Sequence, residues 1–401
     1  MPGTERLYYR DSFLREFEAR VLRVEPGEAG RCGVVLDRTA FYPTSGGQPH
    51  DLGALGDLAV EDVQENEAGE VVHVVARAPA AATVRGVIDW PRRFDHMQQH
   101  TGQHLLSAAF VRLFNWPTAS FHLGRDLCTI DLETGSLGPR QLQQAEELAN
   151  QVIFEDRPVH VRFVPPGGEL EKEGLRRSPA RQGELRLIEI EEFDRCPCGG
   201  THVARTGQIG LVLLRGTEKL RGQARVEFVC GGRALAAARA DYQHLQDAAR
   251  LLTTGPAELP AVLRKQQEER RAADKARAQL LERLAELEAG VLLEEAETVG
   301  GRCLLVKVFE DAAADYLRLL AARLVQEPNV QLLLAAKSPA AAVVFAQSPG
   351  GPADMNALLR EALAALDGKG GGSRDFAQGA LPNANRLEEA LEAARRRLQE
   401  S

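Results

Sequence analysis

Two short motifs, each with two potential metal ligands four residues apart, constrain this chain more than any other feature. His100 and His104 enclose the first motif, His-Thr-Gly-Gln-His, and Cys198 and His202 enclose the second, Cys-Gly-Gly-Thr-His. Zinc prefers imidazole and thiolate ligands, either four in a tetrahedral site or three plus a water. Because the motifs lie far apart in the sequence, the fold must bring them together. The sequence therefore predicts a metal site on a large scaffold, unlike the local loop of a zinc finger.

The first motif lies in a segment with helical periodicity. From Asp95 to Phe114 the only glycine is Gly102 and there is no proline. The apolar residues recur at helical spacing, at Leu105, Leu106, Ala109, Phe110 and Leu113. Residues four apart share one face of a helix, so His100 and His104 can chelate one ion.

The second motif predicts a tight loop, because two glycines follow Cys198. A strand is expected after it, at residues 211–214. Cys196-Pro197-Cys198 offers two thiols for one ligand position. We favour Cys198 for its spacing to His202, and Cys196 remains the alternative.

Further motifs extend this pattern over most of the chain. HTGQHLL and CGGTHV resemble the paired zinc motifs of the editing domain of alanyl-tRNA synthetase and of its freestanding relatives, the AlaX-type trans-editing proteins. Residues 41–49 with Asp51-Leu52-Gly53 resemble the domain that precedes the editing domain, and residues 206–210 and 225–228 resemble the sequence after the second motif. Residues 368–379 resemble the DHHA1 domain that ends the synthetase.

The resemblance implies a zinc-dependent aminoacyl-tRNA deacylase. The expected reaction is hydrolysis in trans of mischarged tRNA(Ala), first Ser-tRNA(Ala) and second Gly-tRNA(Ala), since a pocket for alanine discriminates poorly against close analogues. The implied zinc ligands are His100, His104, Cys198 and His202. The implied partner is the acceptor stem and 3′ end of tRNA(Ala), with contacts expected at Gly46, Gly47, Gln48, Lys369, Gly370, Gly371 and Arg374. Before residue 41 there is no room for aminoacylation domains, so no tRNA charging is expected.

Catalytic roles can be assigned only as hypotheses. Backbone N–H groups of Gly199 and Gly200 are candidate oxyanion donors, and Thr101 is a candidate partner for a serine hydroxyl. Zinc can activate a water, or it can hold the substrate's α-amino group. The synthetase has a glutamine on the strand after its first motif; this chain has none there, and His122 is a candidate for its place.

The predicted fold class is a multidomain α+β protein. A β-barrel-like domain is expected over 1–88, an α/β zinc editing domain over 89–235, a helical hairpin or coiled-coil linker over 236–297, and a small DHHA1-like α/β domain over 298–401. An apolar stripe on the long helix predicts packing in the hairpin or a homodimer, through Ala273, Ala276, Leu280, Leu284 and Leu287. The glycine run 368–372 predicts either a phosphate cradle or a flexible linker.

Composition is compatible with these expectations. The 401 residues include six cysteines and carry a net charge of −8. A reduced, cytoplasmic setting is expected, with no membrane segment, because no apolar run approaches ~20 residues. The acidity predicts weak, transient contact with tRNA. Two rival functions remain: a tRNA-binding protein whose zinc is purely structural, and a zinc hydrolase of another ester or amide. Phosphoesterase activity is not expected, because the DHH catalytic half is absent.

Overall fold

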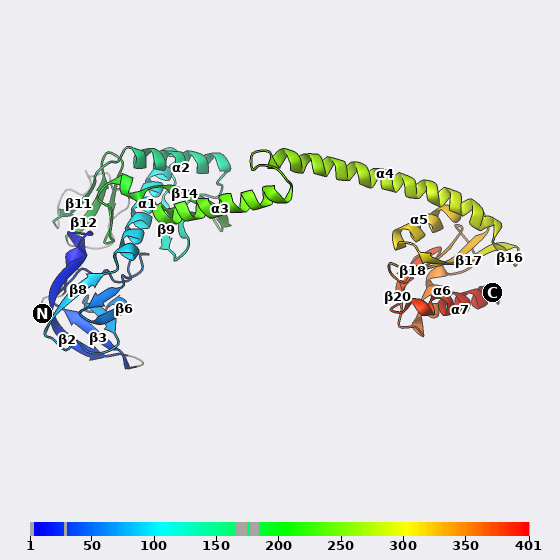
Figure 1. The fold of residues 1–401 in the computed structure, drawn as a ribbon, viewed down its shortest axis with the longest axis horizontal. Coiled ribbons are helices and arrows are strands. Elements are labelled where there is room, and N and C mark those ends of the chain that lie inside the picture. The colour runs from blue at the N-terminus through cyan, green and yellow to red at the C-terminus, as the bar shows by residue number, and fades with distance from the viewer. Residues whose placement is uncertain (1–3, 28–29, 166–174, 177–183, 401) are drawn as a thin grey trace. The chain divides into compact units, whose positions relative to one another are not determined.

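The protein is a multidomain α+β molecule, described here by a computed structural model of residues 4–27, 30–165, 175–176 and 184–400. It divides into two compact units, Met1–Ala248 and Ala249–Ser401 (Figure 1). The predicted fold class is confirmed at this level, and the four predicted domain boundaries remain a prediction. In the described parts of the chain, no helix has the length and apolar character needed to cross a bilayer.

The first unit begins with a closed six-stranded barrel, as expected from the sequence. Its strands, in barrel order, are β2 (Glu16–Pro26), β3 (Cys32–Leu36), β7 (Val71–Val75), β6 (Leu58–Glu65), β5 (Gly53–Leu55) and β8 (Thr83–Ile88). Buried and exposed residues alternate along β8, so one face of the strand fills the barrel. A short parallel pair joins β1 (Glu5–Arg6) to β4 (Arg38–Thr39), and η1 (Leu7–Tyr9) directly follows β1 in the chain.

The rest of this unit is built on the helix α1 (Trp90–Phe114), which is buried on all sides from Gln99 to Phe110. Asp89 caps its first turn by accepting a hydrogen bond from Arg92 N, and Asn115 ends it with a left-handed φ of 55°. The helix therefore covers the whole segment of helical periodicity, Asp95 to Phe114, and includes the residues from Trp90 that open it.

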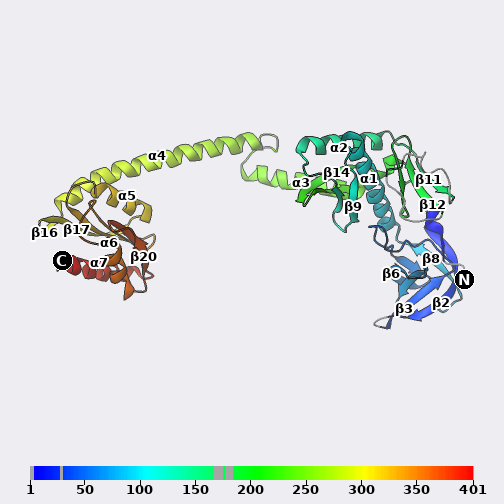
Figure 2. The ribbon, with the colours of Figure 1, turned by 180° about the vertical axis from the view of Figure 1, so that it is seen from behind.

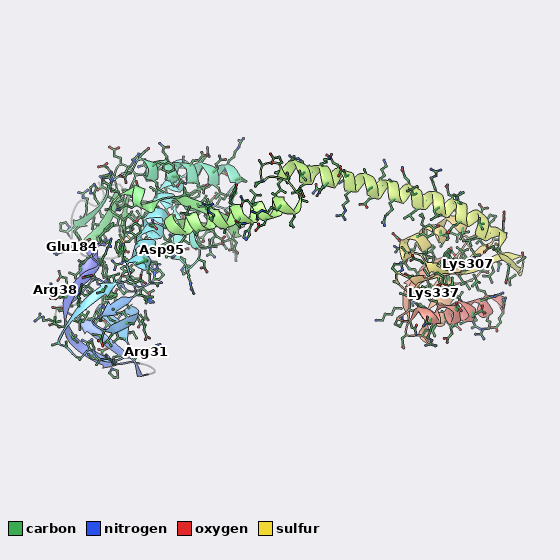
Figure 3. The ribbon with its side chains drawn as sticks, viewed as in Figure 1. Arg31, Arg38, Asp95, Glu184, Lys307 and Lys337 are labelled. Atoms are coloured by element: carbon green, nitrogen blue, oxygen red, sulfur yellow. The ribbon has the colours of Figure 1, made fainter. Side chains whose placement is uncertain are left out.

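Two antiparallel sheets contact α1. One has the order β14 (Val212–Leu220), β15 (Gln223–Cys230), β10 (Cys128–Leu132), β9 (Thr118–Leu123), and the other β11 (Val159–Val164), β12 (Leu185–Ile190), β13 (Asp194–Pro197). The remaining elements are α2 (Pro139–Phe154), η4 (Thr206–Ile209) and α3 (Gly231–Leu251). Asp95 of α1, labelled in Figure 3, accepts a hydrogen bond from Arg233 Nε of α3 at 2.9 Å.

The second unit has a six-stranded sheet between two layers of helices (Figure 2). The strand order is β16 (Glu297–Val299), β17 (Arg302–Asp311), β18 (Val330–Ser338), β19 (Ala342–Gln347), β21 (Phe376–Ala380), β20 (Lys369–Gly372). The end of α4 (Leu259–Glu294) and α5 (Ala314–Leu324) cover one face, and α6 (Met355–Ala364) and α7 (Leu387–Gln399) cover the other. A short turn, η5 (Ala384–Arg386), precedes α7.

The glycine run 368–372 is not a flexible linker, which corrects that reading of the sequence, while the phosphate cradle stays a prediction. Residues 369–372 form the edge strand β20, which pairs antiparallel with β21. A Cβ on Gly370 would lie 2.7 Å from Gln378 O, and one on Gly372 would lie 2.2 Å from Phe376 O. The glycines therefore serve the close approach of two strands, which sequence alone does not distinguish from a loop.

The stripe predicted on α4 is exposed in the second unit. Leu280, Leu284 and Leu287 are 66, 44 and 73% exposed. The helix packs instead through Ala285, Ala289 and Leu292, which contribute to the core with α5. No element of the second unit that the structure describes therefore covers the predicted stripe.

Candidate metal centre

The fold brings the two motifs together. His100 and His104 project from α1, and Cys198 and His202 lie in the segment that follows β13. Their ligand atoms all lie within 4.8 Å of one another. Cys198 Sγ is 3.4 Å from His100 Nε2 and 3.3 Å from His202 Nε2. Three imidazoles and one thiol thus converge at a single point.

Each of the three histidines has a polar neighbour at Nδ1, which lies at hydrogen-bond distance for His100 and His202 and farther away for His104. Gln48 Oε1 is 2.8 Å from His100 Nδ1, Thr101 Oγ1 is 3.1 Å from His202 Nδ1, and Asp194 Oδ2 is 3.5 Å from His104 Nδ1. A proton held at Nδ1 leaves the Nε2 lone pair for a metal. The centre therefore has the ligand types and the outer partners of a zinc site.

Gln48 is not an RNA contact, which corrects the prediction made from its glycine-rich motif. Its side chain is fully buried. Gln48 Nε2 donates to Thr201 Oγ1 at 2.9 Å, while Oε1 accepts from Thr201 N at 3.2 Å. These bonds define the orientation of the amide, so Oε1 must accept the proton of His100 Nδ1. Gln48 positions a ligand.

The two glycines before Gln48 form the turn that aims it inward. Gly46 and Gly47 have φ of 56° and 86°, and Ser45 pairs with Gln48 across them. A Cβ on Gly47 would lie 2.8 Å from Phe121 O. Of the predicted RNA contacts in this motif, Gly46 lines a cavity beside the metal centre.

Thr101 also differs from its predicted role as a partner for a substrate hydroxyl. It is fully buried and does not line the cavity. Its Oγ1 accepts a hydrogen bond from Val203 N at 3.1 Å and contacts His202. Thr101 thus orients His202 rather than substrate.

The adjacent glycines of the second motif have different surroundings. Gly200 N donates to Cys198 Sγ at 3.3 Å, so this N–H is not the oxyanion donor that the sequence predicted. A Cβ on Gly200 would lie 2.2 Å from His100 Cε1, whereas one on Gly199 would approach nothing closer than 3.5 Å. Gly199 lines the cavity and remains a candidate donor.

The surroundings of Cys198 favour the thiolate. Burial opposes ionisation, but the neighbouring imidazoles, His100 first among them, bring the pKa of Cys198 well below its usual value. Burial lowers the pKa of His202 to about 3, which keeps this imidazole neutral and able to bind a metal. Cys196 is buried at the cavity wall, outside the four-residue cluster.

A cavity of about 840 Å³ opens beside the centre. Its wall includes His100, His104 and Cys198 together with polar residues that sequence reasoning missed, namely Gln103, Thr118, Ser120, Glu133 and Arg176. Gln103 Nε2 and Thr118 Oγ1 both donate to Ser107 Oγ, at 2.8 and 2.7 Å. Gln103 lies in the first motif, directly before the ligand His104, and this position is the sequence signal that could have marked it as a cavity residue.

His122 does not occupy the place suggested for it. It is exposed and absent from the cavity wall. Its neighbour Phe121 lines the cavity and stacks on His100, with ring centroids 5.3 Å apart.

A buried ion pair joins the barrel to α1. Arg93 Nε donates to Asp51 Oδ1 at 2.9 Å, and both side chains are fully buried. Arg93 Nη1 also donates to Ser12 O at 3.0 Å, and Tyr42 N donates to Asp51 Oδ2 at 2.6 Å. These bonds hold the first turns of the helix that carries two ligands.

The predicted C-terminal RNA contacts lie in the second unit. Lys369, Gly370 and Gly371 belong to β20, and Arg374 lies in the turn before β21, where its Nη2 donates to Pro352 O at 3.3 Å. Their contact with RNA stays a prediction.

Three family models match this chain. The tRNA synthetases class II (A) family matches residues 5–92, and the threonyl and alanyl tRNA synthetase second additional domain matches residues 185–227. The DHHA1 domain matches residues 300–400. The second match includes Cys198 and His202.

Whole-chain relatives fall into two groups. The alanyl-tRNA editing protein AlaX-L of Pyrococcus horikoshii is 33% identical over 94% of this chain and 94% of its own length. The alanine–tRNA ligase of Pyrococcus abyssi is 34% identical over 98% of this chain and 43% of its own length. The chain thus spans less than half of that ligase. Among solved structures, the C-Ala domain of Aquifex aeolicus alanyl-tRNA synthetase is 29% identical over 26% of this chain and 97% of that domain, with a TM-score of 0.25.

Proposed function

This chain belongs to the family of the alanyl-tRNA editing protein AlaX-L, and from this premise we propose that it hydrolyses mischarged tRNA(Ala) in trans. The observation that supports the proposal most is the convergence of four ligand atoms within 4.8 Å at the wall of the cavity. Ser-tRNA(Ala) is the first expected substrate and Gly-tRNA(Ala) the second. The partner is the acceptor stem and 3′ end of the tRNA, and the cytoplasmic location stays a prediction.

Zn²⁺ is the metal that this donor set fits best. Three imidazoles and one thiolate match its preferred ligands, and each imidazole has an outer partner. When bound, zinc can acidify a water or hold the substrate's α-amino group.

The cavity residues would bind and orient the aminoacyl ester. The hydrogen-bonded chain of Gln103, Ser107 and Thr118 supplies polar groups for a serine hydroxyl next to His104. Glu133 lines the same cavity and offers a negative charge to the α-amino group. Gly199 also lines the cavity, and its backbone N–H is the candidate donor to the oxyanion.

The proposal is tested by deacylation of seryl-, glycyl- and alanyl-tRNA(Ala). We expect rapid loss of serine, slower loss of glycine and sparing of alanine, and we expect His104→Ala to abolish all activity. His122→Ala is the matched control, because this histidine is exposed and outside the cavity. Equal rates for His104→Ala and the wild type would contradict the proposal.

A tRNA-binding protein with a structural zinc is the second candidate. Four protein ligands can close a tetrahedral site, which is typical of structural zinc. In that case the wild-type chain would bind zinc and tRNA(Ala) and hydrolyse none of the three esters.

A further inference from the structure

A buried arginine stands behind one of the proposed metal ligands. Arg176 donates from Nε and Nη2 to the two carboxylate oxygens of Asp194, at 2.8 and 3.1 Å. The Arg176 side chain is 10% exposed and that of Asp194 is 2% exposed. A bidentate pair sheltered in this way has a defined geometry.

The same carboxylate faces His104. Asp194 Oδ2 lies 3.5 Å from His104 Nδ1, which is long for a hydrogen bond. Among the residues that the structure describes, His104 Nδ1 makes no hydrogen bond of normal geometry, and the Asp194 carboxylate is the charged group in contact with it. Asp194 therefore supplies the negative charge that faces His104 Nδ1.

His104 differs in this respect from the other two histidines of the centre. His100 and His202 have neutral outer partners, Gln48 and Thr101. Asp194 is ionisable and buried, and an unpaired buried carboxylate is costly. Arg176 supplies the compensating charge, and its own backbone N donates to Arg195 O at 2.9 Å in β13, the strand that contains Asp194.

From this arrangement we propose that Arg176 is a positioning residue for the metal centre. It holds Asp194 against His104 Nδ1, so that His104 Nε2 faces the other three ligands. The inference rests on the proposed metal site and adds a residue that lies outside both ligand motifs.

The test is the zinc affinity of the full chain, measured at equilibrium by competition with a chromophoric chelator. We expect Arg176→Gln to weaken zinc binding by about tenfold, the lower end of the effect of losing an outer partner itself, because Asp194 stays in place. Arg195→Gln is the matched control, because Arg195 pairs with Glu189 at 2.9 Å rather than with Asp194. The control should keep the wild-type affinity. A wild-type affinity in Arg176→Gln would overturn the inference.

Two further variants separate positioning from folding. Arg176→Lys keeps the charge and loses the bidentate geometry, so its affinity should fall between those of Arg176→Gln and the wild type. Because Arg176 acts through Asp194, adding Arg176→Gln to Asp194→Asn should weaken binding no further than Asp194→Asn alone. Independent, additive losses would overturn the inference. A wild-type chain that binds no zinc would overturn the metal site itself.

Discussion

At the scale of single residues, the two adjacent glycines of the second ligand motif, Gly199 and Gly200, have different surroundings. Gly199 borders the cavity with space around it, while Gly200 lies against the His100 ring. The sequence treats the two glycines alike, and both were candidates for the oxyanion site. The distinction depends on a histidine from another element, which no local pattern reveals.

This difference predicts opposite results for the same substitution at adjacent positions. Gly200→Ala places a Cβ 2.2 Å from His100 Cε1 and 2.9 Å from Gln48 Oε1, so we expect at least about a tenfold loss of zinc affinity. In Gly199→Ala the nearest atom is 3.5 Å away, so zinc affinity should be unchanged. Equal affinities for the two variants, measured by chelator competition, would contradict this geometry.

A second residue-scale prediction concerns His73 in the barrel. Burial lowers the pKa of His73 to about 4, against an ordinary value of 6.5, and its ring contacts Thr39 Oγ1 and Val34 O at 2.8 and 3.0 Å. As the pH falls below 6.5, His73 becomes protonated in the unfolded chain but stays neutral in the folded chain until the pH approaches 4. The free energy of unfolding should therefore drop by about 3 kcal/mol between pH 6.5 and pH 4 from this residue.

His73→Gln isolates that contribution. The variant should be less stable at pH 7, because a buried ring and its contacts are lost, yet its stability should fall less than that of the wild type between pH 7 and pH 4.5. Denaturant unfolding of the variant and of the wild type at pH 7 and pH 4.5 measures the fall in the free energy of unfolding for each protein. Identical falls in the two proteins would show that His73 is not the source.

At the scale of elements, α1 is the part that sequence predicted well. Its helical spacing and the pairing of His100 with His104 could be read locally, because residues four apart share a face. The contacts that surround α1 could not be read from the sequence. Gln48 and Asp194 reach the histidines from a barrel turn and from β13, and such contacts between distant segments leave no periodic trace. For the same reason β20 was not recognised as a strand: its glycines match β21 across a hairpin, and their run looks like a linker.

The ion pair between α1 and the barrel yields the prediction at this scale. Arg93→Met leaves Asp51 buried without its charge partner, so we expect a loss of about 3–5 kcal/mol in the free energy of unfolding. Arg92→Met is the neighbouring control. Arg92 is half-buried and its side chain donates from Nε to His50 O at 3.1 Å, so its loss should cost about 1 kcal/mol. Comparable losses in the two variants would contradict a special role for the buried pair.

At the scale of the whole molecule, the long helix α4 presents an apolar face that the second unit leaves exposed. Leu280, Leu284 and Leu287 follow one another at intervals of four and three residues, as in the seam of a coiled coil. We expect this face to form a homodimer, which the sequence offered as the alternative to packing in a hairpin. Sedimentation should show a dimer for the wild type and a monomer when the three leucines are changed to Gln. Leu263→Gln, on another face of the same helix, should leave the dimer intact. A monomeric wild type would contradict the expectation.

The central claim is that the four clustered residues hold the zinc that editing requires. It is tested most directly by following deacylation of seryl-tRNA(Ala) by the wild-type chain as purified, after treatment with a chelator, and after addition of Zn²⁺. The account predicts that activity disappears with the metal and returns when one equivalent of zinc is restored. Full activity in the metal-free protein would contradict it.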